Sequence, residues 1–79
     1  MDMLKAIGKN VRFLRESRGF TQERLASKAG VHRTYIGAIE RGERNLTISN
    51  LCQLAAALKV HPGVLLFEES FRWEPSKGG

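Results

Sequence analysis

The sequence has little of what several protein classes need. Its single cysteine, Cys52, cannot form a disulfide within the chain, which excludes a small disulfide-stapled scaffold. Because Cys52 lies beside Leu51 and Leu54 in a helical pattern, we interpret it as a small residue in or near the core. No apolar stretch approaches the roughly 18 residues of a membrane span, and MDMLKAIGKN lacks the apolar core of a signal peptide. We therefore expect a cytoplasmic protein that does not bind a membrane.

Residue groups that carry catalysis or hold cofactors are also scarce. His32 and His61 are far apart in the sequence and no further Cys or His cluster accompanies them, which argues against a metal site. Glu68 and Glu69 are adjacent, and adjacent positions of a helix do not face each other. The sequence also has no nucleophile–base pair and no glycine-rich phosphate loop. We expect no enzyme activity, no metal and no cofactor.

What the sequence does have is positive charge. Thirteen Lys and Arg residues stand against eight Asp and Glu residues, a formal net charge of +5. Such a balance favours a polyanionic partner without saying which one. The 79 residues allow one domain with a small core, whose stability would gain from dimerisation.

Apolar residues recur at three- and four-residue spacing, which is typical of amphipathic helices. The pattern predicts helices over about 3–18, 21–28, 32–41 and 47–58, and a short fifth helix that follows Pro62 and includes Val64 to Phe67. Gly19, Gly30 and Gly42 follow the first three helices, where glycine commonly ends a helix. The predicted fold class is therefore all-α, a compact five-helix bundle.

The fifth helix is apolar almost all round. Its consecutive large residues are Val64, Leu65, Leu66 and Phe67. A short helix cannot bury all four against one core, so we expect them to lie at a homodimer interface.

Residues 21–41 contain a more specific motif. The second and third predicted helices are separated by a turn of three or four residues that contains Gly30, which is the arrangement of a helix-turn-helix. Ala26 has to be small where the two helices cross, and Gly30 needs a backbone conformation that is costly for other residues. The motif predicts that the helix at 32–41 enters the major groove of DNA.

The segment QERLASKAGVHRTYIGAIER resembles the phage-repressor type of helix-turn-helix, the Cro/repressor or XRE-like family, and the resemblance covers about residues 5–67. HRTYIGAIERGERN, followed by LTISNLCQLAAAL, is similar to controller proteins of restriction–modification systems. That resemblance implies a transcriptional activator and repressor that acts on its own operator. A simple phage-type repressor, and an antitoxin-like interaction module whose apolar segment 64–71 holds a toxin, are the alternatives.

The first turn of the predicted recognition helix carries the side chains expected to contact bases. Arg33 can donate two hydrogen bonds to guanine, and Thr34 offers a hydroxyl and a methyl group. Tyr35 is the third expected base contact, with partly buried packing as the alternative. Direct readout would be sparse, so DNA shape would supply further specificity.

The family resemblance implies further roles. Four residues are expected along the DNA backbone: Gln22, Arg44, Asn45 and Ser49. Arg15 and Glu40 are expected to form a structural ion pair. The implied partners are double-stranded DNA with symmetric half-sites and a second copy of the chain, with RNA polymerase, touched by Glu23, as a further partner. Residues 1–70 would form the DNA-binding and dimerisation domain and residues 71–79 a C-terminal tail.

Overall fold

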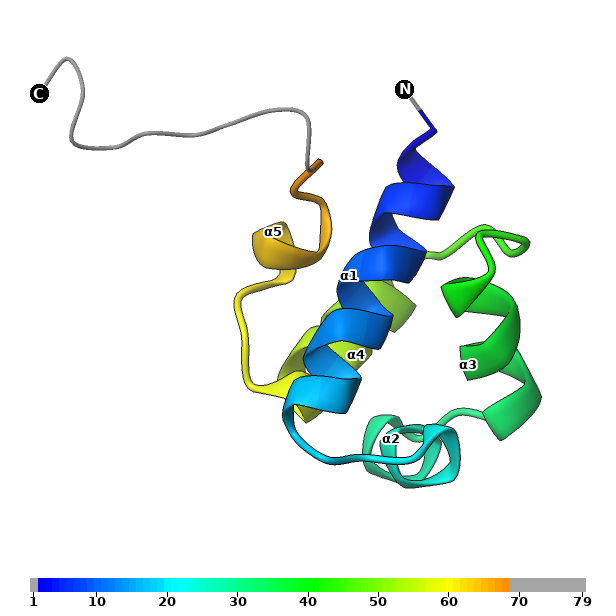
Figure 1. Cartoon of the computed structure of the whole chain (residues 1–79), viewed down its shortest axis with the longest axis vertical. Helices are drawn as coiled ribbons and strands as arrows, with labels where there is room; N and C mark the ends of the chain where they lie inside the picture. The colour runs from blue at the N-terminus through cyan, green and yellow to red at the C-terminus, as the bar shows by residue number, and fades with distance from the viewer. Residues whose placement is uncertain (1, 69–79) are drawn as a thin grey trace, which may run out of the picture.

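The computed structural model describes residues 2–68, and within them the chain is entirely helical, with no strand. The elements are α1 (Met3–Ser17), α2 (Gln22–Ala29), α3 (Arg33–Glu40), α4 (Ile48–Leu58) and α5 (Pro62–Leu65) (Figure 1). This confirms the predicted all-α bundle of five helices. The last helix is shorter than expected: it ends at Leu65 and does not include Leu66 and Phe67. Glu69 and the predicted tail at 71–79 lie outside the described residues.

The two helices of the motif begin and end where local chemistry dictates. The Thr21 hydroxyl accepts a hydrogen bond from the backbone N–H of Arg24 at 3.0 Å, which satisfies one of the free N–H groups at the start of α2. Gly30 ends α2 with φ +72°, a left-handed conformation that favours glycine. The chain therefore reverses sharply and starts α3 only three residues later.

All five helices contribute to one apolar core. Its fully buried large side chains are Val11, Leu25, Ile36, Ile39, Leu54, Leu58 and Leu65. In Figure 1, α3 and α5 lie on opposite sides of α1, and both pack against it. The motif and the apolar end of the described chain are thus presented on different sides of the molecule.

Gly8 allows α1 to approach the end of α3 closely. A Cβ atom at this position would collide with the carbonyl oxygen of Ile39 and would lie 2.8 Å from that of Glu40. Backbone atoms cannot move aside as the end of a flexible side chain can. Glycine at position 8 therefore lets the C-terminal end of α3 sit directly on α1.

Two expectations about burial were wrong. Cys52 is exposed, because the buried stripe of α4 runs through Leu51, Leu54 and Leu58 and position 52 lies about 100° around the helix from Leu51. Leu65 was expected at a dimer interface but is fully buried within its own chain. The α5 turn places Leu65 against the core, so only its apolar neighbours remain exposed.

The described part of the chain has neither a membrane-spanning helix nor a metal-binding cluster. Within residues 2–68, no helix combines the length and the apolar character needed to cross a bilayer. Among those residues there is also no group of three or more His, Cys, Asp or Glu side chains placed to hold a metal ion.

Candidate nucleic-acid interface

A part-buried ion pair fixes the C-terminal end of α3. The Nε atom of Arg15 lies 2.6 Å from Oε2 of Glu40, and the two side chains are only 11% and 5% exposed. The second Glu40 oxygen accepts from Arg15 Nη2 at 3.2 Å, and Arg15 Nη1 donates to the carbonyl of Phe20 at 2.8 Å. The hydrogen bond to Glu40 raises the pKa of Arg15 above its ordinary value, although burial opposes it. Arg15 of α1 and Glu40 of α3 thus form the pair that the family resemblance implied.

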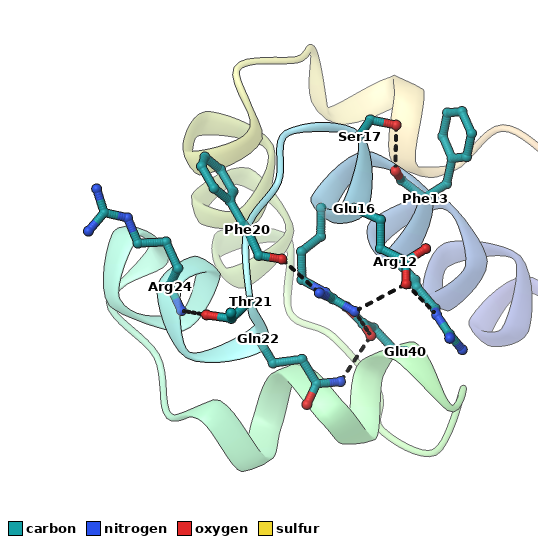
Figure 2. A network of polar contacts seen from close by, with 10 residues as sticks. Arg12, Phe13, Glu16, Ser17, Phe20, Thr21, Gln22, Arg24 and Glu40 are labelled. Carbon is teal, nitrogen blue, oxygen red and sulfur yellow. Dashed lines mark hydrogen bonds and ion pairs between the residues drawn. The ribbon is translucent and has the colours of Figure 1, made fainter.

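Gln22, the first residue of α2, joins the same network. Its Nε2 atom donates to Oε1 of Glu40 at 3.0 Å, as Figure 2 shows. Gln22 was expected to contact the DNA backbone, and its exposed position at the start of α2 leaves that role a prediction. In the free protein its side-chain amide therefore links the start of α2 to the end of α3.

The N-terminal end of α3 is held by weaker and more exposed contacts. His32 precedes the helix, and its Nδ1 atom accepts from the backbone N–H of Thr34 at 3.4 Å and lies 3.0 Å from the Thr34 hydroxyl. Arg33 pairs with Glu23 of α2 at 3.1 Å, but these side chains are 64% and 71% exposed. Ion pairs of this kind contribute about 0–1 kcal/mol. Arg33 can therefore exchange Glu23 for another partner at little cost.

Tyr35 is only partly exposed and is contacted from the segment that follows α3. Its hydroxyl oxygen accepts a hydrogen bond from Asn50 Nδ2 at 2.7 Å. The guanidinium carbon of Arg44 lies 5.1 Å from the centre of the Tyr35 ring, within the range of a cation–π contact. The structure thus gives Tyr35 a packing role, which was the stated alternative, beside the expected DNA contact.

The remaining residues that were expected to contact the DNA backbone lie in the segment that follows α3. Arg44 and Asn45 are exposed in the loop between α3 and α4, and Ser49 is exposed in the first turn of α4. A hollow of about 440 Å³ lies between the start of α3, this loop and α4. It is lined by Val31, His32, Thr34, Tyr35, Arg44 and Asn50. The hollow thus brings residues from both groups of expected DNA contacts together on one surface.

An apolar surface on the other side of α1 is formed by Val64, Leu66 and Phe67, which are 43%, 42% and 41% exposed. The segment is tied to α1 by Asn10, whose Nδ2 atom donates to the carbonyls of Leu65 at 2.9 Å and Phe67 at 2.7 Å. Three of the four residues expected at a dimer interface are therefore exposed, and Leu65 is not.

Sequence reasoning missed the contacts between side chains at this interface. Glu23 and Arg33 are 10 positions apart, Asn50 and Tyr35 are 15 apart, and Gln22 and Glu40 are 18 apart. Each pair joins different helices, so helical periodicity does not reveal it. The Arg15–Glu40 pair was anticipated only because of the family resemblance.

Together, the tight turn at Gly30, the anchored end of α3 and its exposed N-terminal turn define a small DNA-binding domain of the helix-turn-helix type. A family model described as helix-turn-helix matches residues 11–65. The control protein C.SmaI of Serratia marcescens is 43% identical over 74 residues, which cover 94% of this chain and 88% of that protein. The chain belongs to the helix-turn-helix family of DNA-binding transcriptional regulators.

Solved structures agree with this assignment. The restriction–modification controller protein C.AhdI from Aeromonas hydrophila is 42% identical, with a TM-score of 0.77 over 78% of this chain and 94% of that one. SinR, described as a master regulator for biofilm formation and solved in complex with DNA, is 35% identical, with a TM-score of 0.74 over 77% of this chain and 98% of that one. These findings confirm the resemblance to XRE-like regulators and to controller proteins.

Proposed function

We propose that this chain is the controller protein of a restriction–modification system, which activates and represses transcription from its own operator. The observation that carries the DNA-binding part is the exposed first turn of α3, held on a helix whose other end is fixed by a part-buried ion pair. The similarity to C.SmaI and C.AhdI, which are named as controller proteins, supports the narrower role.

In this proposal the residues around α3 divide into two groups. Arg33 and Thr34 contact base edges, because a recognition helix reaches the groove floor with its N-terminal residues. Arg44, Asn45, Ser49 and Gln22 contact the DNA backbone and fix the position of α3. The first group sets sequence preference and the second sets affinity and its dependence on salt.

We further propose that the chain binds DNA as a homodimer through Val64, Leu66 and Phe67. This apolar surface lies across α1 from α3, so its use leaves both recognition helices uncovered (Figure 1). A two-fold axis through it would place two α3 helices on symmetric half-sites, about 34 Å apart for one turn of DNA. The presence of two reading helices would also compensate for the small number of base contacts in each.

The test of DNA binding starts from a duplex that the protein selects from a randomised library. Fluorescence anisotropy then compares this duplex with a scrambled one of equal composition, at several salt concentrations. We expect at least about a thousandfold preference, the lower range for specific regulators. Equal affinity for the two duplexes would contradict the proposal.

The dimer is tested by sedimentation of the protein at micromolar concentration. Leu66→Asp places a charge on the exposed apolar surface and should give a monomer that still folds, because Leu66 lies outside the core. Ile48→Asp is the matched control, since Ile48 is an apolar residue that is 76% exposed and lies in the first turn of α4, outside this surface. A wild-type monomer that does not assemble on DNA, or a dimer that survives Leu66→Asp, would count against this interface.

A further inference from the structure

The contacts of Tyr35 carry an inference about how the proposed DNA binding is achieved. Three elements meet at this side chain: α3 supplies the ring, the loop supplies Arg44 and α4 supplies Asn50. The backbone of Asn50 is held in place, because its N–H donates to the capping hydroxyl of Thr47 at 3.0 Å. Asn50 therefore reaches Tyr35 from a fixed point in the first turn of α4.

The direction of the hydrogen bond between Asn50 and Tyr35 determines whether the Tyr35 hydroxyl can donate to a further group. A tyrosine hydroxyl can donate one hydrogen bond and can accept others. Because Asn50 Nδ2 donates to Tyr35 Oη at 2.7 Å, an accepting position of the oxygen is occupied. The hydroxyl proton is left for a different acceptor. Asn50 thus presents Tyr35 as a donor.

The surroundings define the charge of that acceptor. Arg44 lies over the ring of Tyr35, and the residues that line the adjacent hollow include no carboxylate among those the structure describes. Thr34 also lines this hollow, with its hydroxyl 3.0 Å from Nδ1 of His32. An oxygen that carries negative charge therefore fits best, and in DNA that is a phosphate oxygen.

We propose that Asn50 is a positioning residue for DNA binding: it orients the Tyr35 hydroxyl as a hydrogen-bond donor to a backbone phosphate that also contacts Arg44. The proposal rests on the DNA binding proposed above. It changes the role of Tyr35 from a base contact to a backbone contact, and it assigns a role to Asn50, which the sequence did not single out.

A merely structural role for Asn50 would be to tie α4 to α3. In that case Asn50→Ala would lower the stability of the free protein, and its effect on DNA binding would not depend on the Tyr35 hydroxyl. Tyr35→Phe removes only that hydroxyl. The two roles are therefore separated by combining both substitutions in a double-mutant cycle.

The experiment measures the affinity of wild type, Asn50→Ala, Tyr35→Phe and the double variant for the duplex that wild type selects. We expect Tyr35→Phe to lose about tenfold, as for one hydrogen bond to a charged group, and Asn50→Ala about threefold. The double variant should bind no more weakly than Tyr35→Phe. Gln53→Ala, which truncates an exposed amide on α4, is the matched control and should change nothing.

Two further measurements complete the test. Phosphate-ethylation interference should identify a phosphate in each half-site whose ethylation weakens wild-type binding more than it weakens binding of Tyr35→Phe or Asn50→Ala, in which only the Arg44 contact remains. Tyr35 is the only tyrosine, so its ring signals in an NMR spectrum are unambiguous and should shift in free Asn50→Ala while the urea midpoint stays close to that of wild type.

Three outcomes would overturn the proposal. Asn50→Ala could cost the same factor with and without the Tyr35 hydroxyl, or it could cost nothing. Tyr35→Phe could instead lose a preference for one base pair while the phosphate pattern is unchanged, which would make Tyr35 a base contact. If wild type selects no duplex at all, the proposed function fails first, and the role of Asn50 falls with it.

Discussion

At its C-terminal end α3 is fixed to α1 by the part-buried Arg15–Glu40 pair, whereas at its N-terminal end Arg33 and Thr34 are exposed and weakly held. At the C-terminal end the charged groups already have partners, so a ligand would add no favourable contact there. At the N-terminal end little free energy is lost when the side chains exchange their partners. The difference indicates that the C-terminal end fixes the orientation of α3 and that the N-terminal end contacts the DNA.

The largest effect is expected at the fixed end, from Glu40→Ala. This change removes the main carboxylate partner of Arg15 and leaves its guanidinium, 11% exposed, with Glu16 at 3.9 Å, which should cost about 2 kcal/mol of unfolding free energy. Urea denaturation followed by circular dichroism measures it. Glu43→Ala, which breaks the exposed pair with Arg41, should cost less than about 0.5 kcal/mol. If the two variants cost the same, the Arg15–Glu40 pair holds α3 no more firmly than an exposed pair does.

Gly8→Ala tests the close approach that lets the fixed end form. Alanine favours a helix over glycine by about 1 kcal/mol, so propensity alone predicts a more stable protein. The collision with the backbone of Ile39 and Glu40 should reverse the sign and destabilise by about 1–2 kcal/mol. The melting temperature should fall by several degrees. A rise would show that α1 and α3 can separate slightly at no cost.

At the exposed end, His32→Ala removes the side chain that caps α3. We expect a loss of about 0.5 kcal/mol in unfolding free energy, because the bond to the Thr34 N–H is long at 3.4 Å. His32→Asn is the matched variant, since asparagine is among the preferred capping residues and should recover the loss. Equal stability of the two variants would mean that the cap does not contribute.

The smallest effect on stability is expected from Glu23→Gln, which removes the charge that holds Arg33 in the free protein. Because both side chains are mostly exposed, the unfolding free energy should change by less than about 0.5 kcal/mol. Binding to the selected duplex should be unchanged or tighter, since Arg33 no longer has to leave a carboxylate. Weaker binding of Glu23→Gln would show that Glu23 itself supports the complex.

Helical periodicity, together with the positions of Gly19, Gly30, Gly42 and Pro62, was enough to predict all five helices to within a few residues. Thr21 and Thr47 cap α2 and α4, and Gly30 forms the predicted turn. The errors concern direction around a helix. Cys52 faces solvent and Leu65 faces the core, because short apolar runs do not specify which side is buried.

The site was less predictable than the fold, for a physical reason. Which residues lie near the start of α3 follows from the motif, but their partners depend on how the helices cross. Asn50 of α4 contacts Tyr35 of α3, and Gln22 of α2 contacts Glu40 of α3. Contacts of this kind form between side chains that no sequence pattern brings together.

The central claim is that the exposed end of α3 reads the DNA sequence, and a comparison of Arg33→Ala with Arg24→Ala tests it most directly. Both variants lose one positive charge, and Arg24 of α2 points away from Gln22 and Glu40 in Figure 2. Affinity is measured for the selected duplex, for its single-base variants and for scrambled DNA. Arg33→Ala should lose about 1–3 kcal/mol on the selected duplex and become indifferent at one position of each half-site. Equal losses from both variants on every duplex would contradict the account.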